Sequence, residues 1–353
     1  MKVAPILRLL AAPEAPLRFR LVHTGQHYDA GLSGVFFSQL AIPEPDAHLN
    51  VGSASHAVQT ARVMCAFEEY LLKLPKQPRG VVVVGDVNST VACALVAVKL
   101  EIPVAHVEAG LRSFDRQMPE EINRVVTDAV SDVLLVSEAD GMENLRREGV
   151  ASSRIRFVGN VMIDSLIPEL ERAKALVMPT RLGMRSHYAL VTLHRPSNVD
   201  TVERLTEIVE LLMRLAPRMT IAFPVHPRTR ERMERFGLMG RLAETPEIRV
   251  MEPLGYRENL GMMASALVVL TDSGGIQEET SFLGVPCLTI RPNTERPITI
   301  NQGTNTLIDG ALSKVDDLIG DILSGTYKRG GPIPGWDGHA ADRIVSELTH
   351  SWA

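Results

Sequence analysis

Residues 266–284 read ALVVLTDSGGIQEETSFLG, and this stretch indicates the fold class. Its first six residues are almost all apolar, which is typical of a strand buried on both faces. A polar turn, Asp272-Ser273-Gly274-Gly275, follows, and then a helical pattern that ends at Gly284. A buried strand that leads through a tight turn into a helix is the repeating unit of parallel α/β sheets. The stretch therefore predicts an α/β protein with a doubly wound parallel sheet.

The same alternation extends outward from this stretch. Apolar runs of strand length recur at 18–23, 80–85, 103–107, 132–136, 154–158, 188–193, 219–225, 248–251 and 285–290. Helical patterns lie between them, including 54–73, 89–100, 119–130 and 138–148. Near 165–186 a charged helix gives way to a polar link with Pro179 and Gly183, so we expect the chain to divide there. The pattern predicts two doubly wound domains that face each other across a cleft.

Length and composition fit a two-domain globular protein. The chain has 353 residues, more than twice the roughly 150 residues of one domain. Hydrophobic residues make up 45% and charged residues 22%, with a net charge of -5, which excludes a disordered chain and a large nucleic-acid footprint. No apolar stretch reaches the roughly 18 residues of a membrane span. Cys65, Cys93 and Cys287 lack metal-type spacing, and we expect reduced thiols in a cytoplasmic protein.

Two nucleotide-binding motifs are absent: the sequence contains neither G-x-G nor G-x-x-x-x-G-K-[ST]. An anion can still bind at a helix N-terminus, where free N–H groups and the helix dipole attract negative charge. The best candidate is the turn at 272–275, because Gly274 and Gly275 let the backbone approach a ligand and Ser273 can donate to a phosphate oxygen. Glu279, farther along the helix, can accept hydrogen bonds from two ribose hydroxyls. The alternative is an ordinary strand–helix turn that Ser273 caps.

Acidic side chains follow the strands of the first half. Asp86 and Glu108 each come directly after a predicted strand, and Glu120 and Glu121 begin a predicted helix. Because parallel strands end at one edge of a sheet, we expect these carboxylates to converge. Carboxylates that crowd in a cleft acquire different pKa values, which divides acid from base roles. Taken singly, Asp86 also fits a capping residue, and the two glutamates fit ordinary helix-start charges.

Basic side chains follow the strands of the second half. His194 and His226 each end a predicted strand and would face the cleft, and Arg296 follows another strand. A guanidinium can clamp a phosphate with two hydrogen bonds, and an imidazole can transfer a proton. The alternatives are histidines that only complete hydrogen bonds and an arginine solvated in a loop. We expect three further histidines to be structural: His23, His27 and His106.

Eight motifs together resemble one enzyme family. They are TGQHYD (24–29), GDVNST (85–90), HVEAGLRS (106–113), PEEINR (119–124), LHRPSN (193–198), PVHPRTR (224–230), DSGGIQEE (272–279) and TERP (294–297). In order and spacing they resemble the non-hydrolysing UDP-N-acetylglucosamine 2-epimerases. The resemblance implies a GT-B fold of two Rossmann-like domains and a homodimer. It implies an N-terminal domain at 1–167 with the acid/base carboxylates, a UDP-binding domain at 168–335, and a last helix at 336–353 that packs back on the first domain.

The resemblance also implies the chemistry. The family interconverts UDP-GlcNAc and UDP-ManNAc without a metal or nicotinamide cofactor, by anti elimination of UDP to 2-acetamidoglucal and re-addition on the other face. Its product supplies ManNAc for cell-surface polysaccharide, and neither nucleic acid nor membrane is implied as a partner. Matching positions imply acid/base roles for Asp86, Glu108 and Glu120, assistance to the leaving diphosphate for His194, and substrate binding for Lys2, His226, Ser273, Gly274, Gly275, Glu279 and Arg296.

The sequence departs from the family pattern at several places. The family's opening strand and G-T-R-P-E loop precede the position of Lys2, so we expect the first strand of domain 1 to be missing here. Ser197 replaces a glutamate, Asn259 replaces a frequent aromatic near the uracil, and Asp29 ends the activator motif. Two alternatives therefore stay open: a GT-B glycosyltransferase that uses a UDP sugar, and a truncated, non-catalytic UDP-sugar-binding protein.

Overall fold

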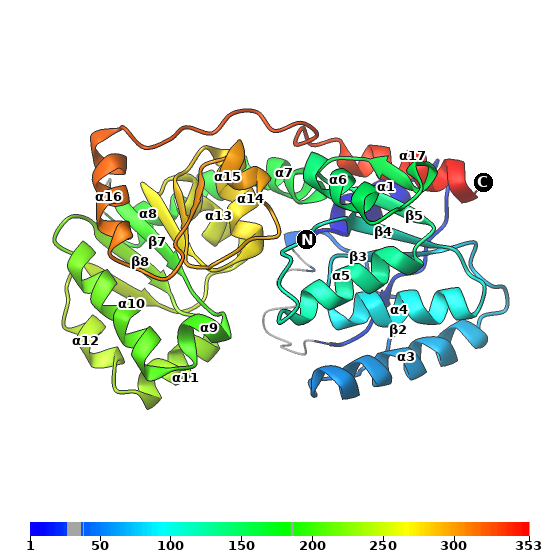
Figure 1. The fold of residues 1–353 in the computed structure, drawn as a ribbon, viewed down its shortest axis with the longest axis horizontal. Helices are drawn as coiled ribbons and strands as arrows, with labels where there is room; N and C mark the ends of the chain where they lie inside the picture. The colour runs from blue at the N-terminus through cyan, green and yellow to red at the C-terminus, as the bar shows by residue number, and fades with distance from the viewer. Residues whose placement is uncertain (27–36, 38, 185–186, 353) are drawn as a thin grey trace. The chain divides into compact units, whose positions relative to one another are not determined.

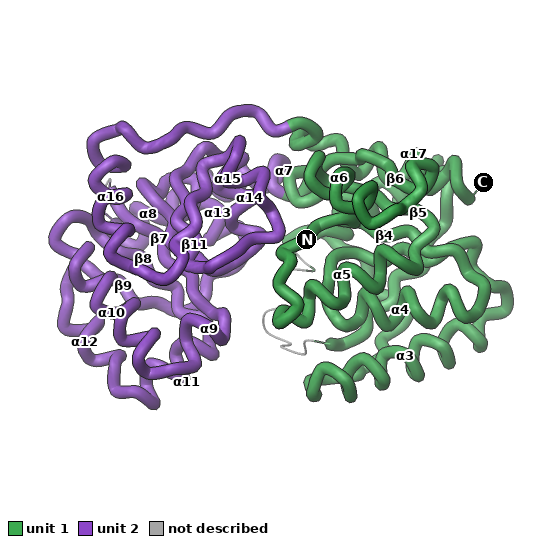
Figure 2. Tube along the Cα trace, in the orientation of Figure 1, with its two compact units in different colours: residues 1–165, 334–353 green, residues 166–333 purple. Residues whose placement is uncertain are grey.

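The computed structural model describes residues 1–26, 37, 39–184 and 187–352. They form two compact units, each an α/β domain on a parallel sheet (Figure 2). Unit 1 is Met1–Ser165 with Pro334–Ala353, and unit 2 is Leu166–Ile333. Two residues discussed above, His27 and Asp29, lie outside the described residues.

The main sheet of unit 1 has four parallel strands in the order β3-β4-β5-β6. They are β3 (Val81–Val84), β4 (Val104–Ala109), β5 (Val133–Val136) and β6 (Ile155–Phe157). Two short strands, β1 (Val22–His23) and β2 (Ala47–His48), pair with each other in a separate sheet. The strand expected at 18–23 is therefore shorter than predicted and does not join the main sheet, because its ladder partner is β2.

Different helices cover the two faces of this sheet. The helices of unit 1 are α1 (Ala4–Leu10), α3 (His56–Leu72), α4 (Asn88–Lys99), α5 (Pro119–Val130), α6 (Ala139–Arg147) and α17 (Ala340–Trp352), with a 3₁₀ turn at Ser152–Arg154 and the start of α7 (Val161–Ala175). Ala105 and Val107 of β4 pack in one cluster with α1 and α17. Val104 packs on the opposite face with α3 and α4. The alternating strand residues thus build a three-layer unit.

The last helix of the chain packs on the first, since α17 contacts α1 (Figure 1). Asp164 fixes the start of α17 by accepting hydrogen bonds from the backbone N–H groups of Ala340 (3.2 Å) and Ala341 (2.6 Å). Ile344 and Leu348 then bury one side of the helix. The cap and the apolar side together hold the C-terminal helix in unit 1.

Unit 2 is built on six parallel strands in the order β12-β11-β10-β7-β8-β9. The strands are β7 (Tyr188–Thr192), β8 (Thr220–Pro224), β9 (Ile248–Met251), β10 (Val268–Thr271), β11 (Cys287–Thr289) and β12 (Asn305–Leu307). The helices after α7 are α8 (Met178–Arg181), α9 (Pro196–Val199), α10 (Val202–Leu215), α11 (Pro227–Arg235), α12 (Met239–Ala243), α13 (Tyr256–Ala264), α14 (Gly274–Leu283), α15 (Ile298–Asn301) and α16 (Lys314–Ser324). This is the standard doubly wound order, which reverses between β7 and β10.

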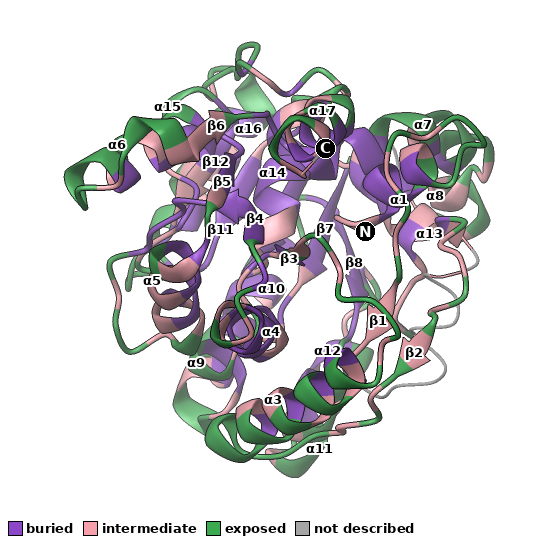
Figure 3. Cartoon of the chain, turned by 90° about the vertical axis from the view of Figure 1, so that its right-hand side faces the viewer, coloured by how far each residue is buried: buried purple, intermediate pink, exposed green. Residues whose placement is uncertain are grey.

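Burial follows the layers of each unit. Strands β4 and β10 are buried along their whole length. Helix α3, in contrast, has many exposed residues (Figure 3). The apolar runs that form β4 and β10 therefore correspond to strands covered on both faces, whereas Val82 of the edge strand β3 is 37% exposed. Within the described ranges, no helix combines the length and the apolar character needed to cross a membrane.

Candidate active site

Strands β7 and β10 are neighbours in the unit 2 sheet, and Thr192 pairs with Thr271 at their carboxyl ends. The order of the strands reverses here, so the loops after the two strands turn to opposite faces of the sheet. These loops carry His194 and the turn at 272–275. Open α/β sheets bind ligands at this position, which makes it the candidate ligand site of unit 2.

Asp272 lies at this reversal of the strand order, which we call the switch point of the sheet. Its buried carboxylate accepts hydrogen bonds from the backbone N–H groups of His194 (3.1 Å) and Arg195 (2.9 Å) and from Nδ2 of Asn198 (3.1 Å). The His194 ring contacts it through Nδ1, at 3.0 Å. Burial alone would raise the pKa of Asp272, but the bond from His194 and the other donors lower it. An ionised Asp272 therefore orients His194 through Nδ1 and leaves Nε2 for a ligand.

Helix α14 begins directly after this carboxylate. Ser273 is its N-cap residue with an extended backbone, but the Ser273 side chain makes no capping hydrogen bond. The Ser273 hydroxyl is therefore not used to cap the helix, and the ligand-binding role of Ser273 stays a prediction. The N–H groups of the first helical turn have no intrahelical partners and favour an anion. Gly274 and Gly275 are the first two residues of this turn.

Arg296 is buried beside the turn, with 4% of its surface exposed. Its guanidinium forms ion pairs with Glu278 (2.8 Å) and Glu295 (2.6 Å), and Glu295 also binds Arg291 (2.7 Å). A Cβ at Gly274 would lie 2.6 Å from Oε1 of Glu295, so this network requires glycine there. The alternative of a solvated loop charge is wrong. The predicted contact of Arg296 with the substrate stays a prediction, and the structure shows the side chain bound to two carboxylates.

Glu279 lies one turn farther along α14 and is fully buried. Burial raises its pKa to about 8; a hydrogen bond from Tyr256 opposes the rise, and Glu278 adds to it. Within the described part of the chain, Oε1 of Glu279 has no hydrogen-bond partner. A buried carboxyl oxygen without a partner suits a ligand donor such as a ribose hydroxyl, and this role stays a prediction.

The raised pKa of Glu279 makes stability depend on pH. The folded protein holds a proton that the unfolded chain releases above pH 4.5, so the free energy of unfolding should fall as pH rises from 4.5 to about 8. We expect this loss to be on the order of 4 kcal/mol, at about 1.4 kcal/mol per pKa unit. Glu279→Gln should remove it, which urea unfolding followed by circular dichroism at pH 5 and pH 8 will measure.

A matched control for this prediction is Glu252→Gln. Glu252 is 82% exposed and forms an ion pair with Arg230 (2.8 Å). Its replacement should leave the pH dependence of the wild type unchanged, because surface ion pairs contribute little. Equal pH dependence in wild type and Glu279→Gln would show that Glu279 is ionised in the folded protein.

His226 ends the loop after β8 and starts α11. Its Nδ1 accepts a hydrogen bond from the backbone N–H of Arg228 (3.2 Å), which caps the helix. The His226 and His194 rings lie 5.5 Å apart between centroids. Burial lowers the pKa of His226, the neighbouring His194 lowers it further, and Asp272 opposes both. A neutral His226 capped in this way carries its proton on Nε2, which gives a hydrogen-bond donor beside His194.

In unit 1, Lys2 and Glu108 form an ion pair. Glu108 is buried in β4 at an irregularity in the pairing with β5, and its φ is +71°. A bulge of this kind re-aims a side chain at the end of a strand. A Cβ at Gly85 would lie 3.4 Å from Nζ of Lys2 and 3.5 Å from Oε2 of Glu108. The structure thus brings Lys2 and Glu108 together against the residue that precedes Asp86.

Asp86 forms an ion pair with Arg124 of α5. The Arg124 side chain is 2% exposed and also binds Glu121 (2.8 Å). The alternative that Asp86 caps the next helix is wrong, because Val87 is the N-cap residue of α4 and no side-chain cap is made. Arg124 instead holds the Asp86 carboxylate from α5.

The two acids at the start of α5 have different environments. Glu121 is buried and accepts hydrogen bonds from the backbone N–H groups of Ser113 and Phe114, both at 2.9 Å. Burial alone would raise the pKa of Glu121, but the bonds from Ser113 and from Arg124 lower it. Glu120 is only half-buried, at the second residue of the helix. Glu121 is therefore a structural carboxylate, and Glu120 is the one left accessible to a ligand.

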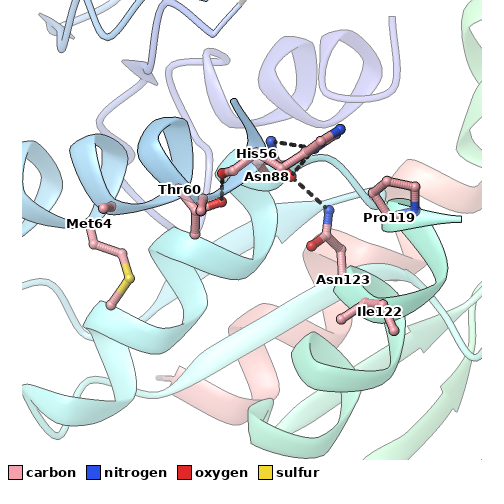
Figure 4. A pocket seen from close by; sticks show the side chains of 9 residues that line it. His56, Thr60, Met64, Asn88, Pro119, Ile122 and Asn123 are labelled. Atoms are coloured by element: carbon pink, nitrogen blue, oxygen red, sulfur yellow. Dashed lines mark hydrogen bonds between the residues drawn. The ribbon is translucent and has the colours of Figure 1, made fainter. Parts of the chain in front are cut away.

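The backbone of Asp86 is also held by an amide network. Nδ2 of Asn123 donates to the Asp86 carbonyl (2.9 Å) and to Oδ1 of Asn88 (3.2 Å). Asn88 contacts Nδ1 of His56 (3.1 Å) (Figure 4). Asn88 also donates to Oε1 of Gln59 (2.8 Å). Residues of α3, α4 and α5 line a pocket of about 470 Å³ at this place. Helix α5 thus fixes both the backbone and the carboxylate of the same residue.

Three residues that shape the unit 1 site were not singled out from the sequence: Asn123, Arg124 and Asp128. A signal for two of them existed in the helical spacing. Arg124 and Asp128 follow Glu120 by four and eight residues, which places all three on one side of α5. The partners of these side chains come from distant segments, and no local pattern names them.

The comparisons with known proteins decide the family. The family model described as UDP-N-acetylglucosamine 2-epimerase matches residues 11–349. The chain is 41% identical to the UDP-N-acetylglucosamine 2-epimerase of Methanocaldococcus jannaschii, over 99% of this chain and 96% of that one. This chain belongs to the UDP-N-acetylglucosamine 2-epimerase family. It is an isomerase with the GT-B type of fold, as the motifs predicted.

Solved structures of 2-epimerases match nearly the whole chain. The M. jannaschii enzyme in complex with UDP-GlcNAc and UDP superposes with a TM-score of 0.90, at 41% identity, over 99% of this chain and 96% of that one. The Neisseria meningitidis 2-epimerase bound to UDP-GlcNAc superposes with a TM-score of 0.87, at 27% identity, over the same shares. A 2-epimerase that is named for a different substrate has the same sequence identity to this chain as the M. jannaschii enzyme. The UDP-2,3-diacetamido-2,3-dideoxy-D-glucuronate 2-epimerase of Pseudomonas aeruginosa is 41% identical, over 93% of this chain and 90% of that one.

Proposed function

We propose that this 2-epimerase interconverts UDP-GlcNAc and UDP-ManNAc. The observation that carries the proposal is that three features gather at the switch point of unit 2. They are the His194–Asp272 pair, the start of α14 and the buried Glu279. The N–H groups at the start of α14 and the His194 ring suit a diphosphate, and the unpartnered Glu279 oxygen suits a ribose. The solved relatives with UDP-GlcNAc bound support the same class of substrate.

The reaction needs an elimination because the C2 hydrogen is not next to a carbonyl group. Removing that proton alone would leave an unstabilised carbanion. In an anti elimination, a base takes the C2 proton while the C1–O bond breaks, and UDP leaves with the bonding electron pair. The product is 2-acetamidoglucal, with a double bond between C1 and C2. UDP then adds back to C1 while an acid on the other face protonates C2.

We assign the proton transfers to the acids of unit 1 and the diphosphate to unit 2. The acid/base groups are Asp86, Glu108 and Glu120, and His194 assists the leaving diphosphate. The substrate-binding residues are Lys2, His226, Ser273, Gly274, Gly275, Glu279 and Arg296. Lys2 holds Glu108 and Arg124 holds Asp86, which gives two of the acids fixed orientations.

A second candidate substrate is UDP-2,3-diacetamido-2,3-dideoxy-D-glucuronate. It is favoured by the P. aeruginosa relative, whose identity of 41% equals that of the M. jannaschii enzyme. The same elimination would operate on it, because the reacting bonds at C1 and C2 are the same. The two substrates differ at C3 and C6, so the sugar-binding contacts would decide between them.

We also propose a cellular setting for the enzyme. The motifs that mark the family imply a cytoplasmic homodimer whose product supplies ManNAc for cell-surface polysaccharide. Sedimentation of the purified protein will check the dimer. The polysaccharide role will be checked by loss of ManNAc from the cell surface when the gene is deleted.

Proton NMR of the purified protein with UDP-GlcNAc in D₂O, without any acceptor, tests the proposed reaction. We expect UDP-ManNAc to appear with deuterium at C2, because elimination exchanges the C2 hydrogen with solvent. Faster conversion of UDP-2,3-diacetamido-2,3-dideoxy-D-glucuronate would favour the second substrate. UDP binding without conversion or exchange of either sugar would contradict the proposal and favour a glycosyltransferase or a binding protein.

A further inference from the structure

His106 lies in β4, two residues before Glu108, and is completely buried. Its ring contacts two oxygen atoms: Nδ1 lies 2.6 Å from Oδ1 of Asp128, and Nε2 lies 2.8 Å from the carbonyl oxygen of Gly85. Histidine at this position was expected to be structural. Its two contacts connect it to the segments that carry the candidate catalytic acids.

The backbone groups that this pair holds lie next to both acids, Asp86 and Glu108. Gly85 directly precedes Asp86, and Gly110 follows Glu108 by two residues. The second carboxylate oxygen of Asp128 accepts a hydrogen bond from the Gly110 N–H, at 3.0 Å. Both glycines have positive φ values, +72° for Gly85 and +82° for Gly110. The Gly85 N–H continues the sheet ladder by donating to the Val107 carbonyl (3.0 Å). The Gly85 carbonyl and the Gly110 N–H, in contrast, bond to the side chains of His106 and Asp128, so these two side chains help to set the backbone conformation beside both acids.

We propose that His106 and Asp128 form a positioning pair for Asp86 and Glu108, in which His106 donates from both ring nitrogens. The importance of the two acids rests on the proposed function, whereas the hydrogen-bonding state of the pair does not. A carbonyl oxygen only accepts hydrogen bonds, and so does an ionised carboxylate. Both contacts therefore exist together only when each ring nitrogen carries a proton. His106 is then a buried cation paired with Asp128.

The surroundings balance these buried charges. Nη1 of Arg112 lies 2.7 Å from Oδ2 of Asp128, and Arg112 also binds Glu148 through two bonds, at 2.8 Å and 2.7 Å. His106, Asp128, Arg112 and Glu148 thus alternate in sign. Burial alone would raise the pKa of Asp128, but His106 and Arg112 lower it. A charge in the interior is tolerated when partners of this kind compensate it.

The protonation of His106 is tested directly on the wild-type protein. In ¹⁵N-histidine-labelled protein at neutral pH, the His106 signals are assigned as those missing from His106→Asn. We expect the chemical shifts of both ring nitrogens to be those of N–H groups. A spectrum with one protonated and one unprotonated nitrogen would overturn the proposal, because one of the two contacts would then not be a hydrogen bond. This measurement needs no substrate and no activity.

Two variants separate the two contacts of the ring. His106→Asn keeps a donor near the Nδ1 position, toward Asp128, and loses the bond to Gly85. His106→Gln keeps a donor near the Nε2 position, toward Gly85. We expect His106→Asn to lower kcat by about tenfold to a hundredfold with KM little changed, because small displacements of reacting groups have effects of this size. His106→Gln should restore part of that loss.

Ser131→Ala is the matched structural control. Ser131 is also fully buried, and its hydroxyl donates to the carbonyl of Thr127 (2.7 Å) in the last turn of α5, without contact to either glycine segment. It should lower the melting temperature while leaving kcat and KM as in the wild type. A folded His106→Asn with wild-type kcat would overturn the positioning role. If the wild type itself converts no UDP sugar, the proposed function fails, and the nitrogen spectrum still decides the state of the pair.

Discussion

Replacing Asp86 by Asn, or Glu108 or Glu120 by Gln, is expected to lower kcat for epimerisation by roughly 10²–10⁴-fold, the usual contribution of a positioned acid or base. UDP binding should be nearly unchanged, because the groups assigned to the diphosphate and the ribose belong to unit 2. Conversion of UDP-GlcNAc followed by NMR, together with calorimetric titration of UDP, measures both quantities. Each substitution keeps the shape of the side chain and removes only its charge and its capacity to transfer a proton.

Deuterium exchange in these variants shows which residue transfers the proton on each face of the sugar. The C2 hydrogens of the two epimers lie on opposite faces of the sugar, so a different group must serve each face. A variant that lacks the acid or base on one face of the sugar can still remove and return the C2 proton on the opposite face, while UDP leaves and adds back. It should therefore exchange deuterium into one epimer without forming the other. The epimer that exchanges identifies the face that still has its acid or base.

Glu143→Gln provides the control for general effects of removing a carboxylate. Glu143 is 51% exposed in α6 and pairs with Arg147 (2.8 Å). Its turnover should equal that of the wild type. Wild-type turnover in any one of the three test variants would exclude that residue from proton transfer, and loss of UDP binding together with turnover would indicate a structural role instead.

Most of the fold could be predicted because parallel strands are buried on both faces and therefore read as continuous apolar runs. The run at 103–107 became β4, and the run at 188–193 became β7. The run at 80–85 became β3, although Val82 on this edge strand is exposed. Strands β2 (Ala47–His48) and β12 (Asn305–Leu307) were not predicted. Each is two or three residues long and contains polar side chains, so its identity as a strand depends on its ladder partner and not on its own pattern.

The site was predictable where it follows from topology. A rule about strand ends placed His194 after β7 and Asp86 after β3 from sequence alone. The partners of these residues were not predictable, because they come from far along the chain. Arg124 lies 38 residues from Asp86, and Asp272 lies 78 residues from His194. The same holds for Arg296, whose burial between two carboxylates has no local signal in the sequence.

Arg124→Met is expected to lower the free energy of unfolding of unit 1 by about 3–5 kcal/mol, since removing one partner of a buried ion pair leaves the other charge uncompensated. In the wild type, Arg124 binds the carboxylates of Asp86 and Glu121, and both would lose their cation. Met has a similar length and fills the space of the aliphatic part of the side chain. Both tryptophans of the chain, Trp336 and Trp352, belong to unit 1, so their fluorescence reports on its unfolding.

The effect of Arg124→Met should depend on pH in a defined direction. The pKa of Glu121 is lowered in the folded protein, so its contribution to stability is present above pH 4.5 and is lost as pH falls through the lower, folded value. The difference between wild type and variant should therefore be largest near neutral pH and shrink below pH 4.5. Arg147→Met, which breaks an exposed pair, should cost at most about 0.5 kcal/mol. Equal losses in the two variants at neutral pH would mean that the buried pair contributes no more than a surface one, and Asp86 would then need another group to hold it.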